Sequence, residues 1–218
     1  MSGFRVTGRG WQSQVLFGLS LLFLIFGLIT ICWAIWPQRQ DATQLAIPAG
    51  ILPGAPAGTA YASLATYDLT ISWPRWIRLG ETDSIKVLLV PADDGESTLE
   101  GEDPTQVVLI EPTLGMMAVT PAGRLQANIA PGQALDMTWR VTGEQVGAYN
   151  GKVYLSFGFY DEAEEKLVPV PVAVVDVTIR VIALWGLQQP IALWLGFVGL
   201  VIWGVLFLLG RWIQLKHA

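Results

Sequence analysis

Two long runs of apolar residues lie near the two ends of the chain, and much of the sequence between them alternates between apolar and polar positions. The first run, residues 15–36, contains no charged residue and no proline. As an α-helix rising about 1.5 Å per residue, such a run can cross the roughly 30 Å hydrocarbon layer of a bilayer. The second run, residues 191–210, has the same character. We therefore expect two transmembrane helices.

The first run could also be a cleaved signal peptide, because a basic start followed by an apolar stretch describes both. A signal peptide has an apolar core of about 7 to 15 residues, with small residues at its cleavage site. Here the run is longer, and residues 33–37 read Trp-Ala-Ile-Trp-Pro. This ending favours an uncleaved anchor.

The charges beside the two runs predict their orientation. Both tails are basic and free of acidic residues: residues 1–14 carry Arg5 and Arg9, and residues 211–218 carry Arg211 and Lys216. Basic flanks are retained on the cytoplasmic side of a membrane. We therefore expect a multi-pass protein of the plasma membrane, with both termini in the cytoplasm and residues 37–190 outside it.

Between the runs, the period of the pattern is two. The clearest case is residues 135–142, where apolar side chains alternate with polar ones, as in a strand buried on one face. No helical period separates these runs, so an antiparallel β-sandwich of about seven strands is predicted within residues 66–183. The candidate strands are residues 67–73, 85–89, 106–110, 116–120, 125–129, 135–142, 153–159 and 168–183.

Two connecting segments flank this predicted domain. Residues 37–65 are rich in proline and glycine and are expected to form an extended linker without regular structure. Residues 184–190 are expected to form a short stem before the second helix. Apolar residues of the linker could fold back and cover part of the domain: Leu45, Ile47, Ile51 and Leu52.

The domain resembles the immunoglobulin-like and fibronectin-like sandwiches of cell-surface proteins. The resemblance rests on Trp139 in the middle of a strand and on the sequence Val146, Gly147, Ala148, Tyr149 that leads into another. It implies a fold and no activity, because many unrelated functions share this fold. The pair of cysteines that flanks the tryptophan in true immunoglobulin domains is missing.

Charge and cysteine usage narrow the setting. The tails hold four of the thirteen basic residues and none of the eighteen acidic ones, so the segment between the runs holds nine basic residues against eighteen acids. This balance argues against nucleic acid as a partner. The one cysteine, Cys32, lies in the first run, so the outer domain has no disulfide, and the chain has no Asn-x-Ser/Thr sequon. These features favour a bacterial envelope protein.

Composition also limits the chemistry. The outer domain contains neither histidine nor cysteine, so we expect no catalytic site, no cofactor and no zinc or copper site there. Carboxylates are the exception, because a cluster of them could hold calcium. A solvated acidic loop is the alternative reading of these six residues: Asp93, Asp94, Glu96, Glu100, Glu102 and Asp103.

Small residues predict how the apolar helices pack. In lipid, helices associate through close van der Waals contact, which small side chains allow. Residues spaced by seven share one face of the first helix, and a second such set lies on one face of the other. We predict contacts at Ser20, Gly27 and Ala34 in the first helix, and at Ala192, Gly196, Gly199 and Gly210 in the second.

One predicted strand suggests a contact with another protein. Residues 170–175 are apolar at consecutive positions, although the outward face of a sandwich strand is normally polar. We expect an outward row of Val170, Val172 and Val174 to bind a partner, unless the linker covers it.

These observations favour a non-enzymatic integral membrane protein whose outer domain is an interaction or scaffold module. Its expected partners are the bilayer and other membrane or envelope subunits, in the manner of an accessory subunit of a larger complex. The alternative is a ligand-sensing or adhesive surface domain with a calcium-dependent acidic loop.

Overall fold

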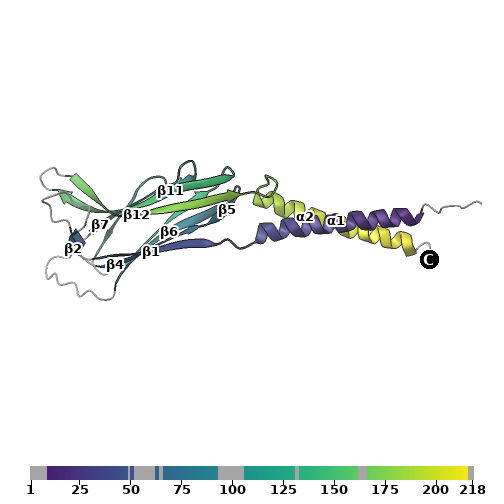
Figure 1. Ribbon diagram of the computed structural model, residues 1–218, viewed down its shortest axis with the longest axis horizontal. Coiled ribbons are helices and arrows are strands. Elements are labelled where there is room, and N and C mark those ends of the chain that lie inside the picture. The colour runs from purple at the N-terminus through teal and green to yellow at the C-terminus, as the bar shows by residue number, and fades with distance from the viewer. Residues whose placement is uncertain are drawn as a thin grey trace, which may run out of the picture. The chain divides into compact units, whose positions relative to one another are not determined.

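The computed structural model describes residues 9–48, 50–51, 62–63, 66–92, 106–130, 133–161 and 166–215 (Figure 1). The chain divides into a helical unit, Met1–Pro37 with Ala183–Ala218, and a strand unit, Gln38–Ile182. Its elements are α1 (Arg9–Ile35), β1 (Gln40–Ile47), β2 (Gly50–Ile51), β3 (Ala62–Ser63), β4 (Tyr67–Pro74), β5 (Trp76–Arg78), β6 (Thr82–Pro91), β7 (Gln106–Thr113), β8 (Ala118–Thr120), β9 (Leu125–Ile129), β10 (Leu135–Thr142), β11 (Gly147–Asp161), β12 (Lys166–Ile182) and α2 (Gln189–Leu215).

The helical unit consists of α1 and α2 packed side by side. Within them, Gln14–Ile35 and Gln189–Leu215 are long and apolar enough to cross a membrane. Both helices extend beyond the predicted runs, because the polar and basic residues that flank an apolar run continue the helix. The exception is Trp36, which lies after the end of α1.

The strand unit contains two five-stranded sheets. The first sheet has the order β1-β4-β6-β10-β8, and the second has the order β5-β12-β11-β7-β9. Every pairing in them is antiparallel except that of β5 with β12. β2 and β3 form a separate small pair. The predicted antiparallel sandwich is therefore confirmed.

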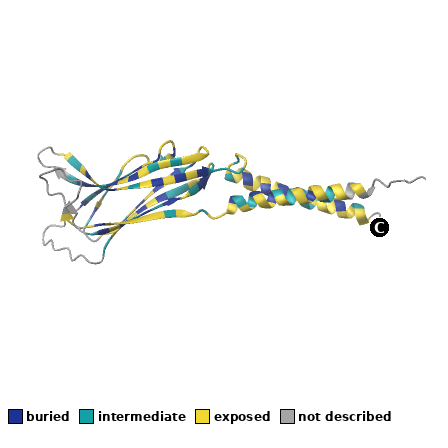
Figure 2. Ribbon diagram, viewed as in Figure 1, coloured by how far each residue is buried: buried dark blue, intermediate teal, exposed yellow. Residues whose placement is uncertain are grey.

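The core lies between the two sheets, where alternate side chains meet (Figure 2). In β6, Ile85, Val87 and Leu89 are fully buried, while the lysine and leucine between them are exposed. Trp139 of β10 is the largest fully buried side chain. The period of two predicted these strands because each one has a dry face and a wet face.

The structure differs from the sequence prediction in the segment before the sandwich. Residues 40–47, predicted to be unstructured linker, form β1, which pairs with β4 from Gln40 opposite Pro74 to Ile47 opposite Tyr67. Ile47 is buried in the core, whereas Leu45 is 44% exposed. β1 is held by its backbone hydrogen bonds to β4, and its own sequence does not alternate between apolar and polar residues. The apolar–polar pattern therefore did not predict it. Leu52 lies outside the described residues.

A largely buried ion pair fixes the turn between β5 and β6, where the chain leaves the second sheet for the first. The Arg78 side chain is 3% exposed, and its Nη1 lies 3.3 Å from Oε2 of Glu81. The Arg78 backbone N–H donates to the same carboxylate, and the guanidinium lies 5.1 Å from the centroid of the Trp76 ring. Gly80 provides the left-handed conformation of this turn, with φ of 75°. Losing the Glu81 carboxylate would remove this pairing from a guanidinium that is almost fully buried, which is destabilising.

One buried hydroxyl in the core has no hydrogen-bond partner among the residues that the structure describes. Tyr67 is fully buried, its ring packs edge-on against Phe157 with centroids 6.3 Å apart, and its Oη is unpaired. Burial raises the pKa of the Tyr67 hydroxyl above its ordinary value of 10.0. Burying a hydroxyl without a hydrogen bond lowers the stability of the folded state, whereas a phenylalanine ring at the same place would not have this cost.

Tyr67→Phe should therefore raise the free energy of unfolding by about 1 kcal/mol. The gain should grow above about pH 10, because the unfolded tyrosine then loses its proton while the buried one keeps it. Denaturant unfolding of the full chain in detergent, followed by near-ultraviolet circular dichroism from pH 8 to 11, measures both effects.

Tyr149→Phe is the matched control, because the Tyr149 hydroxyl is exposed and donates to the Gln145 carbonyl oxygen at 2.9 Å. It should give no gain in stability. Equal effects of the two substitutions would show that the Tyr67 hydroxyl is not the unpaired group.

Candidate functional site

The outward face of the second sheet carries an apolar patch. Tyr154 of β11 lies between Val174 of β12 and Glu111 of β7 in register. Tyr154 is 40% exposed and Val174 is 48% exposed. Leu109 of β7 is on the same face, because its neighbours Val108 and Ile110 both belong to the core, but it is only 4% exposed. The exposed part of the patch is therefore formed by Tyr154 and Val174. We call Val107, Leu109, Tyr154 and Val174 the second-sheet patch.

Two ion pairs flank the second-sheet patch. In the row beyond Tyr154 and Val174, Lys152 Nζ lies 3.5 Å from Asp176 Oδ1. On the other side, Arg124 Nη2 lies 3.0 Å from Glu111 Oε2. These side chains are well exposed, so each pair contributes little to stability. Their effect is to place polar groups around apolar ones.

A β-bulge decides which valines of β12 reach this patch. Leu155 opposes Ala173, but Ser156 opposes Pro171, so Val172 has no residue opposite it. An extra residue in one strand turns every later side chain to the other face. Before the bulge Val170 points into the core and is 1% exposed, and after it Val174 points outward.

The predicted outward row of Val170, Val172 and Val174 is therefore wrong for Val170. Val172 is half-buried and packs against the core, and only Val174 is exposed on the outward face. The sequence missed the bulge because consecutive apolar residues carry no sign of which face each one takes. Tyr154, which the sequence analysis did not single out, is the largest exposed side chain of the second-sheet patch. That residues of this patch contact a partner stays a prediction.

In the helical unit, α1 and α2 approach closely along small residues. Ser20, Gly27 and Ala34 are buried in α1, and the buried residues of α2 are Ala192, Gly196, Gly199 and Gly210. A Cβ atom built on Gly27 would lie 2.9 Å from the Gly196 carbonyl oxygen. One on Gly196 would lie 2.6 Å from Thr30 Oγ1. The backbones can therefore approach this closely only because neither residue has a side chain.

Two hydroxyls buried in this contact bond to their own helix. Thr30 is fully buried, and its Oγ1 donates to the Phe26 carbonyl oxygen at 2.9 Å. Ser20 Oγ donates in the same way to the Phe17 carbonyl oxygen at 2.9 Å. At the other end of the contact, Gln189 Nε2 donates to the Ala34 carbonyl oxygen at 3.1 Å. The sequence analysis missed Thr30, although it is one of the few hydroxyl residues within an apolar run.

The remaining predicted site lies outside the described residues. All six acidic residues of the proposed calcium loop, Asp93, Asp94, Glu96, Glu100, Glu102 and Asp103, belong to the segment 93–105. Within the described parts of the chain, no three side chains of His, Cys, Asp or Glu group together as metal ligands. Calcium binding by the acidic loop stays a prediction.

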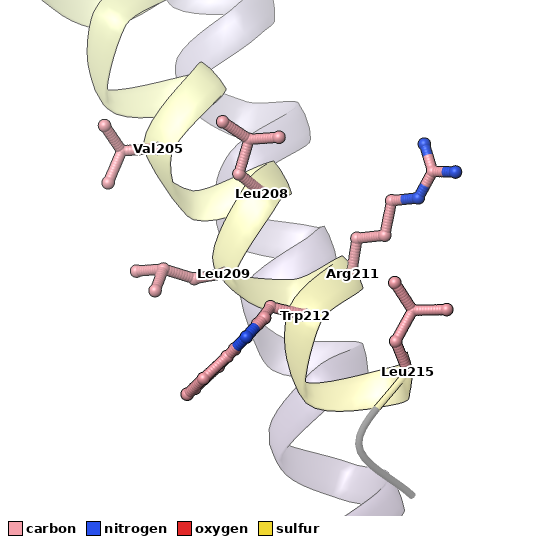
Figure 3. Close-up of a pocket in the computed structure, with 6 residues that line it drawn as sticks. All are labelled: Val205, Leu208, Leu209, Arg211, Trp212 and Leu215. Atoms are coloured by element: carbon pink, nitrogen blue, oxygen red, sulfur yellow. The ribbon is translucent and has the colours of Figure 1, made fainter. Parts of the chain in front are cut away.

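The end of α2 shows that the helical unit presents an open apolar surface there. A shallow depression is lined by Val205, Leu208, Leu209, Arg211, Trp212 and Leu215. Figure 3 shows Leu209 and Trp212 extending to one side of α2 and Arg211 and Leu215 to the other. Side chains that spread outward in this way fit a lipid environment better than an enclosed ligand site.

Comparison with known proteins gives a fold-level likeness. No family model matches the chain, and no curated protein matches it. Similar solved structures include the ASH/PapD-like domain of human CEP192, with a TM-score of 0.30 and 8% identity over 50% of this chain and 82% of that one. Another is the CARDB domain of PF1109 from Pyrococcus furiosus, solved with di-metal ions, with a TM-score of 0.30 and 11% identity over 66% of this chain and 89% of that one.

A further similar structure is AggA, the major subunit of aggregative adherence fimbriae type I from Escherichia coli. Its TM-score is 0.27, with 9% identity over 67% of this chain and 96% of that one. No family is identified, and the sandwich fold rests on the two sheets and the core between them, not on these similarities.

The close approach of α1 and α2 at Gly27 leaves no room for a larger side chain. Gly27→Leu should loosen the pairing of α1 with α2 by about 1–3 kcal/mol, because the new side chain would meet the backbone of α2. The measurement is fluorescence energy transfer between dyes on Ser2→Cys and His217→Cys, in a Cys32→Ser background, during titration with a denaturing detergent. The transition should come at a lower detergent fraction.

Gly18→Leu is the control on the same helix, because nothing lies within 4 Å of a Cβ atom built on Gly18. It should leave the transition unchanged. If both variants behave like the parent chain, the close approach at Gly27 is not what holds the helices together.

Proposed function

We propose that this chain is a non-enzymatic integral membrane protein whose immunoglobulin-like sandwich binds another protein. In this proposal α1 and α2 anchor the chain in the membrane, and the sandwich is an accessory subunit of a larger envelope complex. The observation that carries the proposal is the second-sheet patch, where Tyr154 and Val174 lie exposed beside each other on a sheet face that faces water.

The make-up of this patch suits a protein partner. A tyrosine ring offers a large apolar surface and a hydroxyl that can bond at the margin, and tyrosine is enriched in protein interfaces. The ion pairs Lys152–Asp176 and Glu111–Arg124 surround it with polar groups. An apolar centre within a polar rim is the usual arrangement of such interfaces.

Composition supports the non-enzymatic part of the proposal. The chain has one histidine, His217, and one cysteine, Cys32, and neither lies in the strand unit. Nucleophilic and acid–base catalysis most often use these two side chains. The sandwich would therefore act by binding.

Orientation in the membrane follows from the basic tails. The residues Arg5, Arg9, Arg211 and Lys216 would keep both termini in the cytoplasm. The strand unit, which holds the acidic residues, would then lie outside the cytoplasm, where a second envelope protein could reach it.

The orientation can be tested with single cysteines in a Cys32→Ser background. A membrane-impermeant maleimide added to intact cells should label Thr138→Cys, in the exposed face of β10, and should leave Ser2→Cys and His217→Cys unlabelled. Labelling of Ser2→Cys or His217→Cys would show that the termini lie outside the cytoplasm, which contradicts the proposed orientation. Recovery of a mature chain that starts after Trp36 would show that the first helix is a cleaved signal.

The patch can be tested by charge substitution. Val174→Asp should lower the amount of co-purifying partner about tenfold or more, because burying a carboxylate against an apolar surface costs several kcal/mol. The fold should persist, because Val174 is 48% exposed. Purification from native membranes in mild detergent, with quantitative mass spectrometry, measures the partner.

Thr138→Asp serves as the matched control, since it adds the same charge to an exposed position of the first sheet. It should leave co-purification unchanged. Equal recovery of the same partner with both variants would remove the second-sheet patch from the interface.

A further inference from the structure

The sandwich has four edge strands, and one of them is much longer than the others. The first sheet ends at β1 and β8, and the second ends at β5 and β9. β1 has 8 residues, whereas β8 and β5 have 3 each and β9 has 5. Short edge strands present few unpaired backbone groups, so β1 offers the longest row of them.

Only one side of β1 is paired. Its register with β4 is unbroken from Gln40 to Ile47. Among the described residues, no strand pairs with its other side. Alternate backbone N–H and C=O groups of an antiparallel strand point to each side, so the free side keeps donors and acceptors that another strand can use.

The sandwich is also open along β1. Thr43 and Leu45 oppose Ile71 and Leu69, which are buried in the core, so they face the same side. Nevertheless Thr43 is exposed and Leu45 is 44% exposed. On the edge strands β5 and β9, the inward Ile77 and Ile129 are buried. An additional strand beside β1 would cover Leu45.

The open side of β1 is less protected against strand addition than the open part of β12. β5 pairs with β12 only at residues 180–182, so the preceding part of β12 also has an unpaired side among the described residues. That part contains Pro169, Pro171 and the bulge at Val172, which are devices that prevent strand addition. β1 has no proline, no lysine and no bulge, and its one charged residue is Asp41.

We propose that the free side of β1 binds an extended segment of another protein, which adds to the first sheet as an antiparallel strand. Its inward side chains would be apolar, because they would lie over Leu45. Its outward side chains would be polar, because the outward side of this edge has a shallow depression of about 490 Å³ whose lining includes the polar side chains of Gln44, Asp68 and Thr70. This surface is separate from the second-sheet patch, and the inference does not depend on it.

The probe is a synthetic peptide that copies Tyr67–Pro74, with two lysines at each end and a fluorescent label. β1 already accepts this sequence as an antiparallel partner on its other side, with Leu69 opposite Leu45. Fluorescence anisotropy with the full chain in detergent should show saturable binding. The same peptide with Leu69→Pro and Ile71→Pro should not bind, because proline has no N–H to donate.

Two variants of the protein test whether the peptide binds at the free side of β1. Leu45→Lys puts a charge under the added strand and should weaken binding at least about tenfold. Ala46→Lys puts the same charge on the outward face of the same strand and should keep the affinity within about threefold. Both positions are exposed, so neither substitution should unfold the sandwich. Val174→Asp should bind the peptide like the parent chain.

Hydrogen exchange distinguishes the remaining outcomes. On peptide binding, the amides of residues 40–47 should gain protection and those of β9 should not. The proposal is overturned if binding is absent, if Leu45→Lys binds as well as Ala46→Lys, or if the protection appears elsewhere. It is also overturned if light scattering shows a dimer of the chain that Leu45→Lys separates, because the occupant of the edge would then be a second copy.

Discussion

The alternation of side chains between the two faces of a strand is the constraint on which the sandwich depends. Eight residues of β10 place Met137, Trp139 and Val141 in the core and their neighbours in water. Residues paired between neighbouring strands point to the same face of the sheet. The two sheets can therefore form one core only if every strand keeps its apolar side chains on the inward face. A single added residue, Val172, changes the phase of β12, and with it the surface that the second sheet presents.

The sequence predicted the strands that have one dry and one wet face. Residues 125–129 and 135–142 lie where the alternation placed them, because burial on one face leaves a record in the residue types. β1 shows no such alternation, since its residues other than Asp41 and Ile47 are exposed, and it exists through hydrogen bonds to β4. The bulge left no record in the residue types either, because Val170 and Val174 are the same residue type in opposite environments.

The helical unit follows a different rule. If the two apolar helices lie in lipid, as proposed, their apolar side chains have no reason to leave the solvent, and close packing of small residues decides where the helices meet. Residue size can be read directly from a sequence, so the contact residues could be predicted. Gly27, Gly196 and Gly199 lie in the contact between the helices, as predicted. Thr30 could not be placed in this way, because its hydroxyl bonds to its own helix and makes the side chain tolerable on either face.

If the chain binds a partner as proposed, these two rules give the two units different parts in recognition. The described surface of the helical unit between residues 15 and 35 has no ionisable group other than Cys32, and its buried hydroxyls are satisfied within α1. Such a surface can distinguish partners only by shape. The strand unit offers two further means: β1 presents backbone groups, which any extended segment can match, and the second-sheet patch presents Tyr154 and Val174, which require a complementary surface. Backbone pairing gives affinity with little discrimination, whereas side-chain complementarity gives discrimination. A partner that used both surfaces would therefore be bound through the edge and selected through the face.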